Sequence, residues 1–159
     1  MNIEDARLAT GEALAASVDV VAHLKRLQAR MAALFPLTAD QLEQWGDAER
    51  EQLHAFLRLF EKLHELIGRS LFRGTMILQR EETASLSARD LYERLEQLGV
   101  IESAKKWGEL SDVRNMLVHD YPTTHHKQAT NSNAAWNAFD TLIAVHSKVE
   151  NYIRHRNLI

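Results

Sequence analysis

The chain has no cysteine and only two prolines among its 159 residues. Without cysteine there are no disulfides, no thiolate nucleophiles and no cysteine-ligated zinc sites. No run of about 18 apolar residues could span a bilayer, and residues 1–5 are acidic where a secretory signal would be basic and then apolar. There is no glycine-rich phosphate loop, so we expect the chain not to bind nucleotides by itself. These absences favour a cytoplasmic protein that makes no contact with membranes.

Charge is distributed unevenly along a chain whose net charge is −3. Residues 1–102 carry 12 basic and 17 acidic side chains, whereas residues 103–159 carry 7 and 5, together with five of the eight histidines. The difference has two interpretations. It is either ordinary scatter of surface charge or the mark of a C-terminal part that holds a phosphate-bearing ligand.

Helical periodicity dominates the sequence. Apolar residues recur at steps of three, four or seven, and no alternating strand pattern or fixed repeat is present. This pattern predicts an all-α protein. Pro36 ends the first helix because proline disfavours helical geometry at the residue before it. Long helices are expected over Ile3–Phe35, Asp47–Leu78 and residues 102–120, and a last helix is expected after a polar loop from Pro122 to Asn133. Two shorter helical segments are a connector within Leu37–Gly46 and a helix over Ala88–Leu98. The expected signals at their ends are a Thr38/Gln41 capping box in the connector, Asp47 as the cap of the second long helix, and Ser87 and Gly99 on either side of Ala88–Leu98.

We expect a single domain over residues 1–159, with a long first helix and connector in 1–46 and the core of the bundle in 47–159. The helix lengths predict an antiparallel bundle of four main helices plus short extra helices. On the second helix, Glu61, Glu65 and Arg69 form either a solvated face with ion pairs or a polar wall facing a cleft. His64 and His146 interrupt apolar stripes and are predicted to lie at the boundary of the core.

Residues 112–122 concentrate more chemistry than any other segment. With about 100° per residue, Ser111, Asn115 and His119 form a contiguous polar strip on the predicted helix. Arg114 lies at the border of this strip, where its stem packs on the core and its guanidinium reaches over the strip. The buried side of the helix carries Leu110, Val113 and Leu117.

A phosphate-binding guanidinium beside a histidine that exchanges protons near neutral pH suits metal-free cleavage of RNA. Arg114 would stabilise the charge that develops at phosphorus, His119 would act as base or acid, and Asn115 would orient the phosphate or the imidazole. Because one histidine serves poorly as both base and acid, two copies of the motif are expected to meet across a two-fold axis. A plainer interpretation is that His119 only caps the end of its helix.

The run from Arg114 to Tyr121 has the spacing Arg-x4-His-x-Tyr, with a polar Asn directly after the Arg. It resembles the motif of the HEPN superfamily, especially the HepT-like toxins that pair with a minimal nucleotidyltransferase antitoxin. The resemblance covers roughly residues 45–155. Further residues that carry it are Phe56, Arg58, Phe60, Glu61 and Glu65 on the second helix, and Leu98–Ile101, Trp107 and Leu110 before the motif.

The resemblance implies a homodimeric, metal-independent endoribonuclease that needs no cofactor and in which Arg114 and His119 of both subunits share one cleft. It also implies that the partner nucleotidyltransferase adds AMP to Tyr121 and thereby silences the toxin. On the helical wheel Tyr121 lies next to Arg114, so attached phosphates would compete with RNA for the guanidinium. The other interpretation is that Tyr121 completes the core with its hydroxyl at the surface.

Some members of the superfamily are non-catalytic partners or substrate-binding subunits of nucleotidyltransferases, and that alternative stays open for this chain. Residues 1–46 are longer than in compact members and are expected to support dimerisation or antitoxin binding. The negative net charge predicts a specific or weakly held RNA. In the predicted polar loop, Lys127 would help hold a phosphate backbone, while His125 and His126 lack partners at metal-ligand spacing and predict no metal site.

Overall fold

The fold is all-helical. A computed structural model describes residues 2–119 and 121–159, and no strand occurs among them. The all-α class predicted from the sequence is confirmed. In chain order the elements are α1 (Ile3–Met31), the 3-10 turn η1 (Ala32–Leu34), α2 (Ala39–Gln44), α3 (Asp47–Glu65), the π-helix η2 (Leu66–Leu71), α4 (Phe72–Leu78), α5 (Ala88–Leu98), α6 (Ala104–His119) and α7 (His125–His155).

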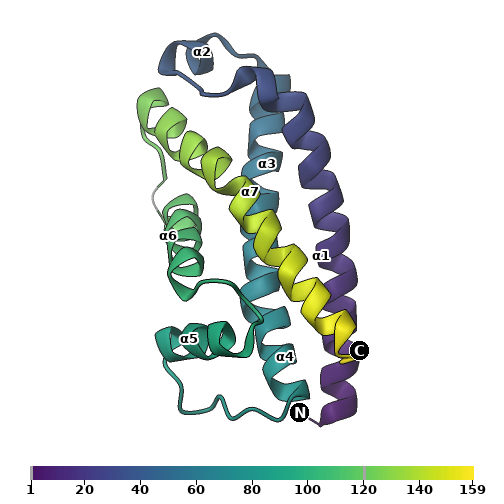
Figure 1. Cartoon of the computed structure of the whole chain (residues 1–159). Helices are drawn as coiled ribbons and strands as arrows, with labels where there is room; N and C mark the ends of the chain where they lie inside the picture. The colour runs from purple at the N-terminus through teal and green to yellow at the C-terminus, as the bar shows by residue number, and fades with distance from the viewer. Residues whose placement is uncertain (1, 120) are drawn as a thin grey trace.

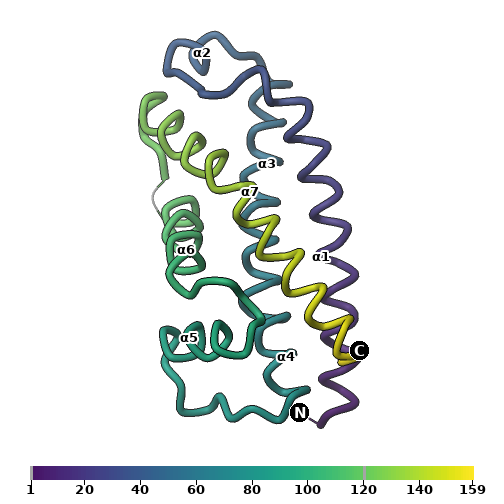
Figure 2. The backbone as a smooth tube through the Cα atoms, viewed as in Figure 1, coloured from purple at the N-terminus to yellow at the C-terminus, as the bar shows by residue number. Residues whose placement is uncertain are grey.

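A continuous rod made of α3, η2 and α4 forms the centre of the molecule. α1 runs along one side of this rod, the chain reverses at α2, and the rod returns beside α1 (Figure 1). α6 and α7 pack on the rod and on each other, and α5 contacts α6 (Figure 2). The rod supplies much of the core because its apolar stripe is fully buried; that stripe comprises Leu53, Phe56, Phe60, Leu63 and Ile67.

The first helix is part of the core rather than an accessory to it. It buries Leu14, Leu24 and Met31 almost completely, and it packs along α3, η2 and α4. Burial of each such side chain contributes about 1.5–3 kcal/mol, so this helix stabilises the domain itself. The predicted end at Phe35 is wrong: α1 ends at Met31 and η1 follows, because the chain tightens into a 3-10 turn before Pro36.

A buried polar pair joins α1 to α7. The Ser17 hydroxyl donates to the Leu14 carbonyl at 2.7 Å, and so it accepts from Nε2 of His146 at 2.8 Å. Burial lowers the pKa of His146, so the imidazole stays neutral in the core. His146 was predicted at the boundary of the core, and its burial places it inside the core.

The connector between the first two helices carries the predicted capping box. Thr38 Oγ1 accepts from the Gln41 amide at 3.2 Å, and Gln41 Oε1 accepts from the Thr38 amide at 2.9 Å. The predicted cap of the next helix is wrong, because Gly46 is the N-cap of α3 and Asp47 is already helical. The Asp47 carboxylate still lies in the first turn, where negative charge is favoured.

Two glycines of the rod allow neighbouring helices to approach closely. A Cβ atom at Gly68, in η2, would lie 3.2 Å from the Trp107 ring of α6. A Cβ atom at Gly74, in α4, would overlap the Thr10 side chain of α1. The two contacts hold the rod tightly, with α1 packed at Gly74 and α6 packed at Gly68.

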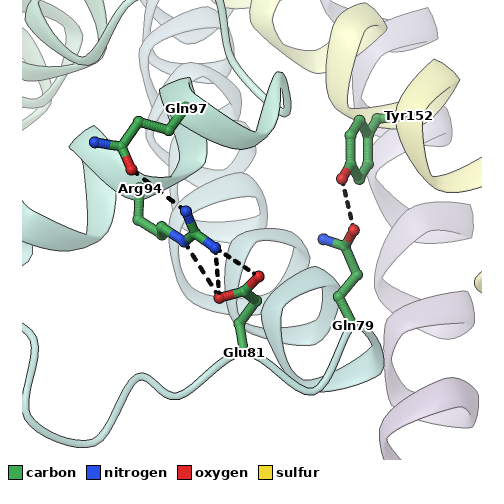
Figure 3. A network of polar contacts seen from close by, with 5 residues as sticks. All are labelled: Gln79, Glu81, Arg94, Gln97 and Tyr152. Atoms are coloured by element: carbon green, nitrogen blue, oxygen red, sulfur yellow. Dashed lines mark hydrogen bonds and ion pairs between the residues drawn. The ribbon is translucent and has the colours of Figure 1, made fainter.

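α5 is bounded by the predicted signals. Ser87 Oγ accepts from the Asp90 amide at 3.1 Å at the start, and Gly99 follows the last turn with a φ of 80°. An ion pair holds the segment before α5: Arg94 donates to both Glu81 carboxylate oxygens, at 2.9 and 3.1 Å from Nη2 (Figure 3). The loop from 79 to 87 is therefore fixed to α5 and not only to the end of α4.

The loop predicted from Pro122 to Asn133 is mostly helix. α7 begins at His125, where Thr124 Oγ1 accepts from the Lys127 amide at 3.1 Å. One polar residue of this run binds the distant connector: Asn133 Oδ1 accepts from the Leu37 amide at 2.7 Å, and Asn133 Nδ2 donates to the Leu37 carbonyl at 3.0 Å. Asn133 is therefore polar because it satisfies the backbone of Leu37, which a local pattern does not reveal.

Two kinds of feature are absent from residues 2–119 and 121–159. No helix there is both long enough and apolar enough to cross a membrane. Nor do three or more histidine, aspartate or glutamate side chains gather there in a way that could hold a metal ion.

Candidate functional site

α6 presents the motif and is anchored at its start by α5. The Ser103 hydroxyl accepts from the Lys106 amide at 3.1 Å, and Glu96 of α5 accepts from the Ala104 amide at 2.9 Å. Two amides at the N-terminus of α6 are thereby satisfied. The helix begins at Ala104 rather than at the predicted residue 102, and it is described as far as His119; the predicted last residue, Asp120, lies outside the described residues.

Arg114 lies at the border between core and solvent, as its position on the helical wheel predicted. Its Nη1 donates to Asn115 Oδ1 at 3.2 Å, while its Nε is buried and has no hydrogen-bond partner among the described residues. Arg114 lines a groove of about 690 Å³ between the rod, the loop before α5, and α6. The guanidinium therefore has capacity to bind an anion in this groove.

Ser111 belongs to a network that reaches from α6 to the rod. Its hydroxyl donates to the Trp107 carbonyl at 3.0 Å, so it accepts from Nε2 of His64 at 3.0 Å. The His64 ring is stacked on the Trp107 ring, with centroids 4.3 Å apart and planes 5° apart. Ser111 thus positions His64 against Trp107, and the predicted phosphate-orienting role of Ser111 stays a prediction.

Burial and the charge of Arg114 perturb two titratable groups on α3. Burial, helped by the nearby guanidinium, lowers the pKa of His64 to about 4, so this imidazole is neutral at neutral pH. Burial also raises the pKa of Glu61, and the charges of Arg114 and Arg58 oppose that shift only in part. The positive charge of the groove near Arg114 therefore comes from guanidinium and not from imidazolium.

His119 and Asn115 are exposed, on the strip that the helical wheel predicted. His119 occupies the last turn of α6, and it does not line the groove that Arg114 lines. Beside it, the side chain of Val118 is 42% exposed. The chain therefore presents Arg114 in a groove and His119 on an open surface, and among the described residues no cavity lined by Arg114 is also lined by His119.

Tyr121 lies beyond the end of α6. It is 83% exposed and lines a second cavity, of about 300 Å³, together with Arg58 and Glu61 of α3. The interpretation in which Tyr121 completes the core is wrong, since most of the side chain is in solvent. Tyr121 is not helical, because Pro122 disfavours helical geometry at the residue before it, so the helical-wheel angle does not describe its position.

Lys127 lies in the first turn of α7 and not in a loop. Its amide is the one that Thr124 caps, and its side chain is partly buried. His125 and His126 are exposed in the same turn. The predicted loop position of Lys127 is wrong, and its role in holding a phosphate backbone stays a prediction.

The sequence interpretation did not predict that His64 and Trp107 line the same groove as Arg114. Nor did it predict that the charge of Arg114 acts on the pKa of Glu61. The predicted position of His64 at the core boundary is confirmed, because it is partly buried, and its place in the groove beside Arg114 was not predicted. A usable signal was present: Glu61 and His64 are three apart on one helix, and Trp107, Ser111 and Arg114 follow at steps of four and three on another. Each set marks one helix face, but nothing in the sequence shows that the two faces meet.

The lowered pKa values predict a stability that depends on pH. His64 and His146 have depressed folded-state pKa values, so the unfolded chain binds more protons below an unfolded pKa of about 6.5. The free energy of unfolding should fall as the pH falls from about 7 to about 5, by on the order of 1–2 kcal/mol for His64. Glu61 acts in the opposite direction at lower pH because its folded-state pKa is raised.

Urea titrations at several pH values measure this dependence. His64→Gln should flatten the slope, whereas His23→Gln, on the exposed face of α1, should leave it as it is. An equal slope in His64→Gln and the wild type would contradict the assignment of a neutral buried His64.

No protein-family model matches this sequence, and no curated protein matches it at significant similarity. The resemblance to HEPN proteins therefore rests on the motif, its flanking residues and its place on α6.

Proposed function

We propose that the protein is the toxin of a toxin–antitoxin pair: a cytoplasmic, metal-independent endoribonuclease of the HEPN type. The observation that carries the proposal is the pair of Arg114 and His119 on α6. Arg114 lines a groove with its guanidinium, and His119 is accessible in the last turn of the same helix. A phosphate clamp and a proton-transfer group are the two parts that RNA cleavage without metal requires.

The active unit in this proposal is a homodimer of antiparallel four-helix bundles, in which the two motifs face each other. A contact between copies would supply a second histidine and would cover the exposed Val118 next to His119. Exposed apolar side chains beside a charged motif are typical of such interfaces. The separation of His119 from the groove of its own subunit is a reason to complete the site with a second copy.

The chemistry follows from the two side chains. One His119 removes the proton of the ribose 2′-hydroxyl, and the 2′-oxygen attacks phosphorus. The bond from phosphorus to the 5′-oxygen breaks, and the second His119 donates a proton to the leaving oxygen. Arg114 stabilises the charge on the non-bridging oxygens, with Asn115 holding the guanidinium through its 3.2 Å hydrogen bond. The products are a 2′,3′-cyclic phosphate and a 5′-hydroxyl.

Regulation in this proposal acts at Tyr121. A minimal nucleotidyltransferase antitoxin adds AMP to its hydroxyl, which its 83% exposure makes accessible. Phosphates attached there would lie close to the end of α6 and would repel RNA phosphates from the motif.

A second candidate is a non-catalytic partner or substrate-binding subunit of a nucleotidyltransferase. The specific observation in its favour is that His119 and Arg114 do not share a cavity in one subunit. In that case the chain would bind its partner and leave RNA intact.

The test is incubation of the purified protein with RNA in the presence of a chelator. The proposal predicts cleavage by a species with the mass of a dimer in sedimentation. RNA that stays uncut by a verified dimer would favour the second candidate.

A further inference from the structure

The groove that Arg114 lines extends well beyond the motif. Its volume of about 690 Å³ lies within the range of small-molecule sites. The walls come from the end of α3, η2, α4, the loop before α5, the first turns of α5, and α6. His119 is not among its lining residues, so the groove is a separate site that shares only Arg114 with the motif.

Three arginines and one carboxylate line the groove. Arg69, Arg73 and Arg114 contribute positive charge, and Glu65 contributes negative charge. Glu65 approaches Arg69 at 3.7 Å, but 80% of the Arg69 side chain is exposed, so this pair is weak. Arg69 therefore remains available to an anion, and the groove has a net positive lining suited to phosphate.

The N-terminus of α5 adds to the positive electrostatic potential of the groove. Ser87 and Ala88 line the groove at the start of an eleven-residue helix. Amides at a helix N-terminus carry partial positive charge and bind phosphate. The helix end and the arginines of η2 and α4 are therefore two independent sources of positive potential on one cavity.

The other residues that line the groove are uncharged. The neutral His64 ring, stacked on Trp107, lines the groove together with Tyr92. Apolar residues on the same cavity include Ile77, Leu86 and Leu91. A flat, uncharged wall next to guanidinium groups suits a base or a ribose attached to a phosphate.

The rim of the groove is held in place. The Arg94–Glu81 ion pair ties the loop before α5 to α5 itself, as Figure 3 shows. The π-helix η2 brings Gly68, another lining residue, against the Trp107 ring. Such π-turns are frequent at functional sites. The groove is thus largely pre-formed, which lowers the entropic cost of binding.

We propose that this groove binds the phosphate of a nucleotide, either free or within an RNA strand, through Arg69, Arg73 and the N-terminus of α5. The absence of a glycine-rich loop led us to expect no nucleotide site in this chain, yet guanidinium groups and a helix end provide one by other means. The inference does not depend on nuclease activity, because Arg69 and Arg73 are no part of the motif.

The test is calorimetric titration of the full-length protein with three probes: AMP, ATP, and a short RNA blocked against cleavage by 2′-O-methyl groups. We expect binding of at least one probe, and affinity at least about tenfold lower in the double variant Arg69→Gln/Arg73→Gln. For RNA, the slope of log affinity against log salt should also become shallower by roughly 0.7 for each phosphate that the variant no longer neutralises. Binding of RNA alone identifies a strand as the ligand, and binding of AMP or ATP identifies a free nucleotide.

Arg26→Gln/Arg30→Gln is the matched control. These two arginines are also four apart and exposed, but they lie on α1 outside the groove. The control removes the same charge and should keep wild-type affinity. Wild-type affinity in the groove variant, or no binding of any probe to the wild type, would overturn the inference. Nucleotide binding without RNA cleavage would contradict only the proposed nuclease function.

Discussion

Replacement of His119 by alanine is expected to lower the rate of RNA cleavage by about 100- to 10,000-fold. The physical reason is the loss of the proton-transfer group, which no other side chain on the exposed end of α6 replaces in the proposed mechanism. The fold should not change, because His119 is exposed in the last turn of its helix. Single-turnover cleavage in chelator measures the rate, and sedimentation checks the dimer.

Arg114→Gln should lower the same rate by about 100- to 1,000-fold, because the amide cannot stabilise the charge at phosphorus. Glutamine keeps part of the stem that packs at the border of the core, so this variant perturbs the fold less than alanine. His23→Ala and Arg26→Gln, both exposed on α1, are the matched controls and should cleave at the wild-type rate. Wild-type cleavage by both motif variants would rule out the nuclease assignment.

If the proposed regulation holds, Tyr121→Phe is expected to abolish addition of AMP and to leave the protein active beside a nucleotidyltransferase antitoxin. The reaction needs a phenolic oxygen, and Tyr121 presents one on a side chain that is 83% exposed. After co-expression with the nucleotidyltransferase, the wild-type mass should rise by one or more AMP units. The mass of the variant should stay unchanged, and cells should stop growing.

Tyr152→Phe is the control for this change. The Tyr152 hydroxyl donates to Gln79 Oε1 at 2.6 Å on a partly buried side chain, so it is a poor acceptor of AMP (Figure 3). This variant should gain AMP as the wild type does. A Tyr121→Phe protein that still gains AMP, or that the antitoxin still silences, would contradict the role of Tyr121.

The helix boundaries that were predicted correctly have local causes. Ser87 and Gly99 delimit α5, and Thr38 with Gln41 caps α2, because each signal acts on amides or carbonyls within a few residues. Local signals of this kind can be read from a sequence.

The errors in the fold arose where distant contacts decide the local structure. The polar run before Asn133 looked like a loop, but Asn133 binds the backbone of Leu37, 96 residues away, and the run is helical. The core of the bundle was predicted within residues 47–159, whereas Leu14, Leu24 and Met31 of α1 are also core residues. A helical pattern shows which face is apolar and does not show what covers it.

The candidate site was predicted in part. The border position of Arg114 and the exposure of Asn115 and His119 follow from helix geometry alone. The contact between His64 and Ser111 joins residues 47 apart, and the groove that Arg114 shares with α4 and α5 depends on how the helices pack. The predicted position of Tyr121 came from a helical wheel that was extended past the end of α6, where the chain is no longer helical.

The most direct measurement of the central claim is the chemistry of the RNA ends that the purified protein produces in the presence of a chelator. Attack by the 2′-hydroxyl under the control of Arg114 and His119 predicts fragments with a 2′,3′-cyclic phosphate and a 5′-hydroxyl. RNA that stays intact, or fragments with 5′-phosphates that form only after a divalent metal is added, would contradict it.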